Sequence, residues 1–145
     1  MSSYRAYHLN AKNKLTHFFG IPLVTLSVFI SFGWFRFSPM DIPISSGTVL
    51  LLVSLFYYLK LHPGIGVVTS LWVFPLFIIG EEIAVSKFSL SVSLFLASFI
   101  IGMGFQLLGH YYEGKKPAFT DNFLQVFNGP LLLTTEVMGR LGFKV

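Results

Sequence analysis

Four long apolar runs limit what this chain can fold into. They cover residues 17–35, 46–61, 64–80 and 88–108. A helix that crosses the hydrocarbon core of a bilayer needs roughly 20 mainly apolar residues, within a range of about 17–25. The first and last runs meet that length, whereas the two middle runs are shorter, so a helical hairpin that enters the bilayer and returns is the competing interpretation of that pair. Run length favours four spans.

The composition supports a lipid environment. Only 11% of the 145 residues are charged and 54% are hydrophobic, whereas a soluble domain carries roughly 25% charged residues. The chain has no cysteine, which excludes disulfides and thiolate metal sites. The aromatic residues lie inside the apolar runs and not beside a dense basic patch, so no nucleic-acid partner is expected. We therefore predict one all-α domain, residues 1–145, that is a polytopic membrane protein with about four transmembrane helices.

The segments between and after these runs contain residues that interrupt helices. Pro39 and Pro43 follow the first run, and residues 62–64 (His-Pro-Gly) separate the second from the third. Residues 109–122 are polar and predict a loop. Residues 123–143 are apolar but contain Gly-Pro and two charges, which favours an interfacial or re-entrant segment over a fifth span.

The basic residues predict the orientation in the membrane. Four spans place both termini and the central loop on one side. That side then carries Arg5, Lys12, Lys14, Lys60, Lys115, Lys116, Arg140 and Lys144. The other side carries only Arg36 and Lys87. By the positive-inside rule, both termini are expected in the cytoplasm, with the chain in the bacterial inner membrane or in the endoplasmic reticulum according to its source.

All four histidines fall on this same predicted side. His8 and His17 precede or begin the first span, His62 lies in the central loop, and His110 ends the fourth span. A nine-residue separation places His8 and His17 on opposite faces of one straight helix, so both can reach one metal only if the chain breaks between them, over residues 10–13.

Further polar residues share helix faces with these histidines. Asn13 lies four residues before His17, and Gln106, His110 and Glu113 follow one another at helical spacing. A polar stripe at the end of an apolar helix is unfavourable in a membrane unless something pairs with it.

The functional interpretation is a metal centre held by imidazoles from both ends of the chain. Three histidine ligands on iron would leave about three octahedral positions, two for the carboxylate and hydroxyl of a 2-hydroxy acid and one for dioxygen. Imidazole also suits Zn, Cu and Ni, so the ligand type does not identify the metal. Asn13, Gln106 and Glu113 would then orient the imidazoles, and Glu113 is alternatively a direct ligand.

Rival interpretations use the same residues without chemistry. Histidines at a membrane interface commonly anchor helices and bind nothing, and His62 within His-Pro-Gly fits a simple turn. A non-catalytic lipid-binding or assembly protein would use the polar residues for helix packing. A small transporter would need a continuous polar route, which the second and third runs do not offer.

Two motifs resemble the fungal-type 2-hydroxy fatty acid dioxygenases. The first begins at Tyr7 and contains His8, Asn10, Asn13, His17 and residues 20–22 (Gly-Ile-Pro). The second contains Gln106, Gly109, His110, Glu113 and Pro117-Ala118, followed by Asp121-Asn122, Gln125, Pro130 and Glu136.

The resemblance implies an Fe(II)-dependent enzyme that uses dioxygen to shorten 2-hydroxy fatty acids by one carbon (α-oxidation), a step in sphingolipid breakdown. It also implies that His8, His17 and His110, which lie in the matched motifs, bind the iron. Asn13 and Gln106 are expected to support these ligands, and Glu113 is the candidate catalytic residue. His62 lies outside the motifs, so its role stays open.

Overall fold

The chain folds into α-helices joined by short connections. The computed structural model describes residues 11–114 and 125–143. In chain order the elements are α2 (Ala11–Gly33), β1 (Arg36–Phe37), the 3-10 turn η1 (Pro39–Asp41), β2 (Ile44–Ser45), α3 (Ser46–Leu61), α4 (Pro63–Ala84), α5 (Phe88–Glu113) and α6 (Gln125–Arg140). The two short strands pair antiparallel, with Arg36 opposite Ser45 and Phe37 opposite Ile44. Apart from this ladder, the predicted all-α architecture is confirmed for the described residues.

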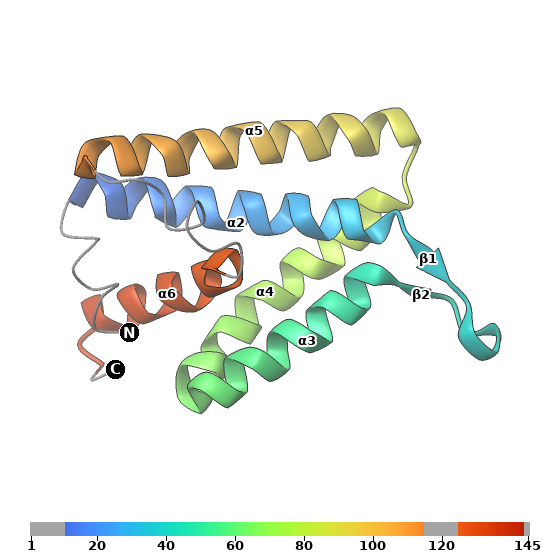
Figure 1. The fold of residues 1–145 in the computed structure, drawn as a ribbon, viewed down its shortest axis with the longest axis horizontal. Coiled ribbons are helices and arrows are strands. Elements are labelled where there is room, and N and C mark those ends of the chain that lie inside the picture. The colour runs from blue at the N-terminus through green and yellow to red at the C-terminus, as the bar shows by residue number, and fades with distance from the viewer. Residues whose placement is uncertain (1–10, 115–124, 144–145) are drawn as a thin grey trace.

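Helix α2 is the centre of the bundle (Figure 1). It lies antiparallel to α5 along most of its length and also contacts α4, α3 and α6. The start of α2 and the end of α5 meet at one end, which we call the histidine end. The other end, which we call the hairpin end, contains the end of α2, the β1–β2 hairpin, the end of α4 and the start of α5 (Figure 1).

Several helix boundaries differ from those that the apolar runs predict. Helix α2 already includes Ala11, so the predicted chain break over residues 10–13 does not occur at residues 11–13. Helix α4 continues through Glu81 and Glu82 to Ala84. Helix α5 continues through the first five residues of the predicted polar loop, which is therefore wrong at its start. Hydrophobicity marks where lipid contact ends, whereas backbone hydrogen bonds continue until a stop signal.

Three helix ends have clear local causes. The Ser45 hydroxyl accepts a hydrogen bond from the Thr48 amide and caps the start of α3. Pro63 begins α4, where its missing donor removes no helical bond. Gly114 ends α5 in the left-handed conformation, with φ of 65°. These local signals set the starts of α3 and α4 and the end of α5.

Among the described residues, three helices are long and apolar enough to cross a bilayer, judged by length and composition. They are α2 over Asn13–Gly33, α4 over Pro63–Ala84 and α5 over Phe88–Tyr112. Helix α3 is apolar but has 16 residues, about 24 Å at 1.5 Å per residue, shorter than a hydrocarbon core of about 30 Å. The prediction of about four spans thus corresponds to three full-length candidates and one short apolar helix.

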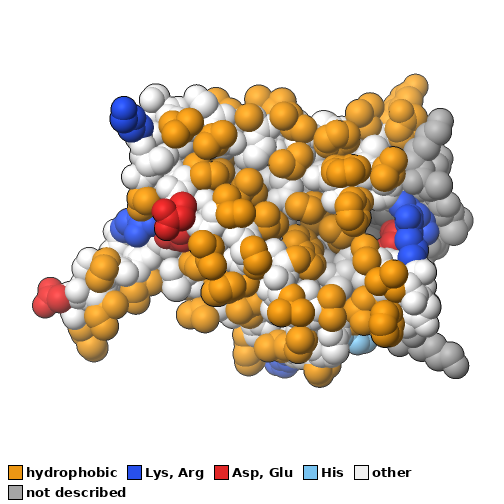
Figure 2. All heavy atoms as spheres, turned by 180° about the vertical axis from the view of Figure 1, so that it is seen from behind, with side chains coloured by type: hydrophobic (Ala, Val, Ile, Leu, Met, Phe, Trp, Pro, Cys, Tyr) orange, Lys and Arg blue, Asp and Glu red, His pale blue; other side chains and the backbone are white. Residues whose placement is uncertain are grey.

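The outer face of the bundle is apolar. Figure 2 shows hydrophobic side chains spread over one face, with the charged side chains near its edges. Leu71 and Phe88 are 70% and 75% exposed. Exposure of so much contiguous apolar surface to water is unfavourable, whereas contact of the same surface with lipid chains is favourable.

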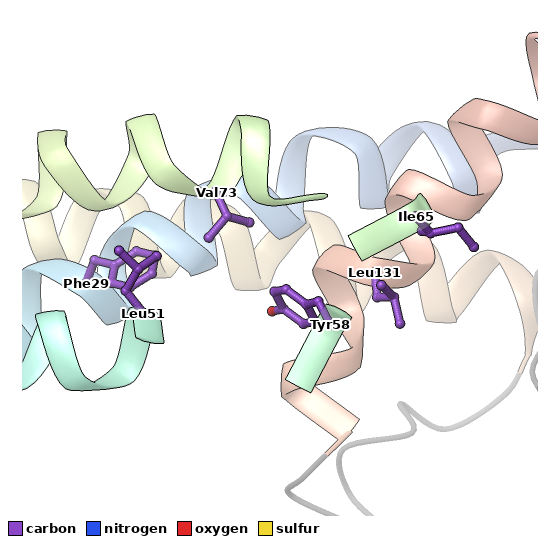
Figure 3. Packing of buried hydrophobic residues seen from close by; sticks show 6 residues of the cluster. All are labelled: Phe29, Leu51, Tyr58, Ile65, Val73 and Leu131. Atoms are coloured by element: carbon purple, nitrogen blue, oxygen red, sulfur yellow. The ribbon is translucent and has the colours of Figure 1, made fainter. Parts of the chain in front are cut away.

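The interior combines a small apolar cluster with buried hydroxyl groups. Phe29, Leu51, Tyr58, Ile65, Val73 and Leu131 form the cluster and come from α2, α3, α4 and α6 (Figure 3). Ser27 is fully buried and donates to the Val24 carbonyl of its own helix. Small polar residues that satisfy themselves in this way allow helices to approach closely in a membrane.

Candidate functional site

Two histidines meet at the histidine end. His17 lies in the second turn of α2 and His110 in the last turn of α5. Their ring centroids are 5.0 Å apart, the rings cross at 80°, and the residues are 6% and 7% exposed. The antiparallel packing of α2 on α5 therefore unites residues from both ends of the chain in one buried position.

A backbone contact sets the proton arrangement on His17. Its Nδ1 lies 3.0 Å from the Asn13 carbonyl oxygen. A carbonyl only accepts hydrogen bonds, so Nδ1 carries the proton and donates. In the neutral ring this leaves the lone pair on Nε2, the arrangement that metal-binding histidines use.

Glycines allow α2 and α5 to approach this closely. A Cβ atom at position 20 would lie 2.9 Å from the Gly102 carbonyl oxygen, so the backbones are nearly in contact there. At Gly109 a Cβ atom would overlap the Asn13 Oδ1 and Thr16 Oγ1 atoms and lie 2.9 Å from His17 Nδ1. Three polar atoms of α2 therefore lie close to Gly109, on the side where any other residue would carry its Cβ atom.

Asn13 has an unusual position among the buried polar residues. It is 0% exposed, and neither its Oδ1 nor its Nδ2 atom has a hydrogen-bond partner in the part of the chain that the structure describes. A buried polar group without a partner costs about 1–3 kcal/mol of stability. The contact that orients His17 comes from the backbone carbonyl of Asn13 and not from this carboxamide.

The other predicted site residues are placed as follows. Gln106 lies one turn before His110 on α5 and packs against Gly20 of α2. Glu113 is the last residue of α5, and its side chain is not among those described. His8 lies outside the described residues. His62 stands at the α3–α4 connection, in the N-cap position of α4 but without a side-chain capping hydrogen bond.

One residue beside the histidine pair, Thr16, was not identified from the sequence. The Thr16 hydroxyl donates to the same Asn13 carbonyl that binds His17, at 2.8 Å. Its only sequence signal is that it directly precedes His17 and lies three residues after Asn13, a spacing that many structural threonines share.

These residues fit part of a metal site. Two buried imidazoles, one with its tautomer set by a carbonyl, suit a transition metal that accepts nitrogen ligands. Among the described side chains, no three His, Asp or Glu residues form a cluster that could hold a metal ion. A complete site would need a further ligand from outside the described residues, where the predicted ligand His8 lies.

Comparison with known proteins identifies a family. The family model described as "2-hydroxy-palmitic acid dioxygenase Mpo1-like" matches residues 1–141. No curated protein and no solved structure matches the chain.

Proposed function

The chain belongs to the Mpo1-like family, and on this premise we propose that it is a membrane-embedded, Fe(II)-dependent dioxygenase of long-chain 2-hydroxy fatty acids. The observation that carries the proposal is the buried pair of His17 and His110 at the meeting point of α2 and α5. Each histidine lies in one of the two motifs that resemble this family. The fold thus brings together the two parts of the chain that carry the resemblance.

In this proposal His17 and His110 hold the iron together with His8. When bound, iron supplies the activation of dioxygen. The Asn13 carbonyl keeps the His17 proton on Nδ1. Both histidines are buried, which limits the access of water to the imidazoles. The candidate catalytic role of Glu113 stays a prediction.

The overall reaction balances without a separate reductant. A 2-hydroxy acid and one dioxygen give the acid that is one carbon shorter, carbon dioxide and one water. The C1–C2 bond breaks, the two carbons together lose four electrons, and dioxygen accepts all four. A membrane site suits this substrate because the acyl chain can stay among the apolar helices while the headgroup reaches the histidine end. The excess of basic residues near that end supports an orientation toward the cytoplasm in this proposal.

The test is a comparison of three histidine variants with the wild type. The protein is purified in detergent without metal-affinity resin, reconstituted with Fe(II) under anaerobic conditions, and assayed for iron content and for conversion of 2-hydroxypalmitate to pentadecanoate. We expect near-stoichiometric iron in the wild type and loss of both iron and turnover in His17→Ala and His110→Ala. His62→Ala is the matched control and keeps both.

Two results would contradict the proposal. The first is full iron content and turnover in the His17 and His110 variants. The second is a folded wild type that takes up no iron, which would favour a non-catalytic lipid-binding or assembly protein that uses these histidines for helix packing.

A further inference from the structure

The Asn13 carboxamide is a buried polar group that the fold itself does not use. Both of its polar atoms lack a hydrogen-bond partner in the described residues, although the residue is 0% exposed. Other fully buried polar side chains are satisfied: Ser27 donates to a carbonyl of its own helix, and the Thr69 hydroxyl is within hydrogen-bond distance of the Ile65 carbonyl and the Thr134 hydroxyl. A buried amide without partners weakens the fold, so its presence indicates a ligand that completes it.

The carboxamide lies beside the two histidines. Asn13 is one helical turn before His17 on α2, and its Oδ1 contacts the bare face of Gly109, which directly precedes His110. A side chain at position 109 would fill the space that Asn13 occupies. The unpartnered amide is thus held at the meeting point of α2 and α5, next to the proposed iron ligands.

The two groups of a carboxamide match those of a 2-hydroxy acid. Nδ2 donates hydrogen bonds and Oδ1 accepts them. In the acid, a carboxylate that accepts and a hydroxyl that donates stand on adjacent carbons. We propose that Asn13 binds this headgroup, with Nδ2 donating to the carboxylate and Oδ1 accepting from the 2-hydroxyl. The inference rests on the proposed function and identifies the residue that selects 2-hydroxy acids over ordinary fatty acids.

This role explains selectivity by a physical difference. An ordinary fatty acid leaves Oδ1 buried and unpaired, whereas a 2-hydroxy acid satisfies it. Sites that are built to bind a hydroxyl reject analogues that lack it for this reason. A purely structural asparagine would have its partners within the protein, as Asn128 has with the Tyr57 hydroxyl, 2.7 Å from its Oδ1.

The experiment measures equilibrium binding to metal-free protein in detergent, by competition against radiolabelled 2-hydroxypalmitate. Unlabelled 2-hydroxypalmitate and palmitate are the two competitors. Without iron, only protein atoms can recognise the 2-hydroxyl. We expect the wild type to bind 2-hydroxypalmitate at least about tenfold more tightly than palmitate, and Asn13→Leu to bind both within about twofold. Asn128→Leu makes the same substitution at a partnered asparagine and keeps the preference.

Thermal unfolding of the same metal-free proteins separates binding from a structural role. Leucine is close to asparagine in size and removes two unpaired polar atoms, so Asn13→Leu is expected to melt no lower than the wild type. Asn13→Ala serves as a second variant if the leucine side chain does not fit beside Gly109, and it is expected to lose the preference in the same way.

The outcomes distinguish this inference from the proposed function. A tenfold preference that persists in Asn13→Leu or Asn13→Ala overturns the inference, and so does a metal-free wild type without any preference. In either case iron uptake and turnover by the wild type would leave the proposed function standing. A wild type that lacks iron uptake, turnover and preference would overturn both.

Discussion

The two ends of the bundle use polar residues in opposite ways. At the hairpin end, Glu81 accepts hydrogen bonds from Arg36 at 2.7 Å and from Ser45 at 2.5 Å, and the Trp34 indole donates to Ser91 at 2.8 Å. At the histidine end, the Asn13 carboxamide is more deeply buried than Glu81 and has no partner in the described residues. Polar groups that satisfy one another hold helices together, whereas a buried group left unsatisfied indicates a ligand.

The comparison separates stability from function by location. Changes at the hairpin end should lower the free energy of unfolding and leave ligand binding intact. Under the proposed function, changes at the histidine end should remove iron or substrate with a smaller effect on folding. This pattern follows the general conflict between a binding site and a stable fold.

Gly109→Ala is expected to have the largest effect. Its Cβ would overlap Asn13 Oδ1 and Thr16 Oγ1 and press on His17 Nδ1, which pushes α2 from α5 and separates the two histidines. Displacement of about 1 Å at a site can reduce turnover about 100-fold, so we expect a loss of at least that size together with loss of iron. Metal analysis and the pentadecanoate assay measure both.

Gly104→Ala is the matched control, on the same helix. A Cβ there meets nothing within 4 Å, and alanine favours a helix over glycine by about 0.5–1 kcal/mol. This variant should keep its iron and unfold at a slightly higher temperature than the wild type. Equal behaviour of the two variants would show that the close approach at Gly109 is not required.

Glu81→Gln tests the hairpin end. The substitution keeps the size of the side chain but removes the charge that binds Arg36, and Glu81 is only 18% exposed. We expect a loss of about 2 kcal/mol in the free energy of unfolding, typical of a hydrogen bond to a charged group. Glu82→Gln makes the same change one residue along, at an exposed position, and should alter stability little. Loss of iron in Glu81→Gln would show that the two ends are coupled, and the separation of stability from function by location would then be wrong.

The sequence was a better guide to the fold than to the arrangement within the site. Long apolar runs and residues such as Pro63 and Gly114 are local signals, so the helices and several of their ends follow from them. The pairing of His17 with His110 depends on which helices pack together, and spacing along one helix carries no such information. The predicted membrane topology put the histidines on one side, and the family resemblance linked the two motifs, but neither predicted which pair of histidines would be in contact.

The details of the site depend on atoms that a sequence does not distinguish. We predicted that Asn13 orients His17 without specifying an atom, and in the structure the Asn13 backbone carbonyl contacts His17 Nδ1. The start of α2 at Ala11 could not be predicted because Lys12 and Lys14 are charged, so the apolar run begins after the helix does. Residue types alone do not predict which backbone carbonyl a side chain contacts.

Thr134→Val tests polar contacts in the interior, between the two ends. The Thr134 hydroxyl accepts from Thr69 and from Trp72, both at 2.9 Å, and so joins α6 to α4. Interhelical hydrogen bonds in membrane proteins contribute about 1 kcal/mol, so thermal unfolding in detergent should show a loss of that size. Thr135→Val removes only a bond within α6, to Leu131, and should cost less. Equal losses of thermal stability in the two variants would mean that the hydrogen bonds of Thr134 to Thr69 and Trp72 do not hold α6 against α4.

Lys14→Gln is expected to have the smallest effect and sharpens the comparison most. Lys14 directly follows Asn13, but its ammonium group is paired with Glu136 at 3.1 Å, and the two side chains are 30% and 24% exposed. Partly exposed ion pairs of this kind contribute about 0.5 kcal/mol or less, and salt weakens them. The variant should therefore unfold almost like the wild type, with unchanged iron content and an unchanged preference for 2-hydroxypalmitate. If Lys14→Gln instead weakened the binding of palmitate and 2-hydroxypalmitate equally, Lys14 would bind the carboxylate. An existing ion pair would then not prevent a side chain at the histidine end from binding the ligand.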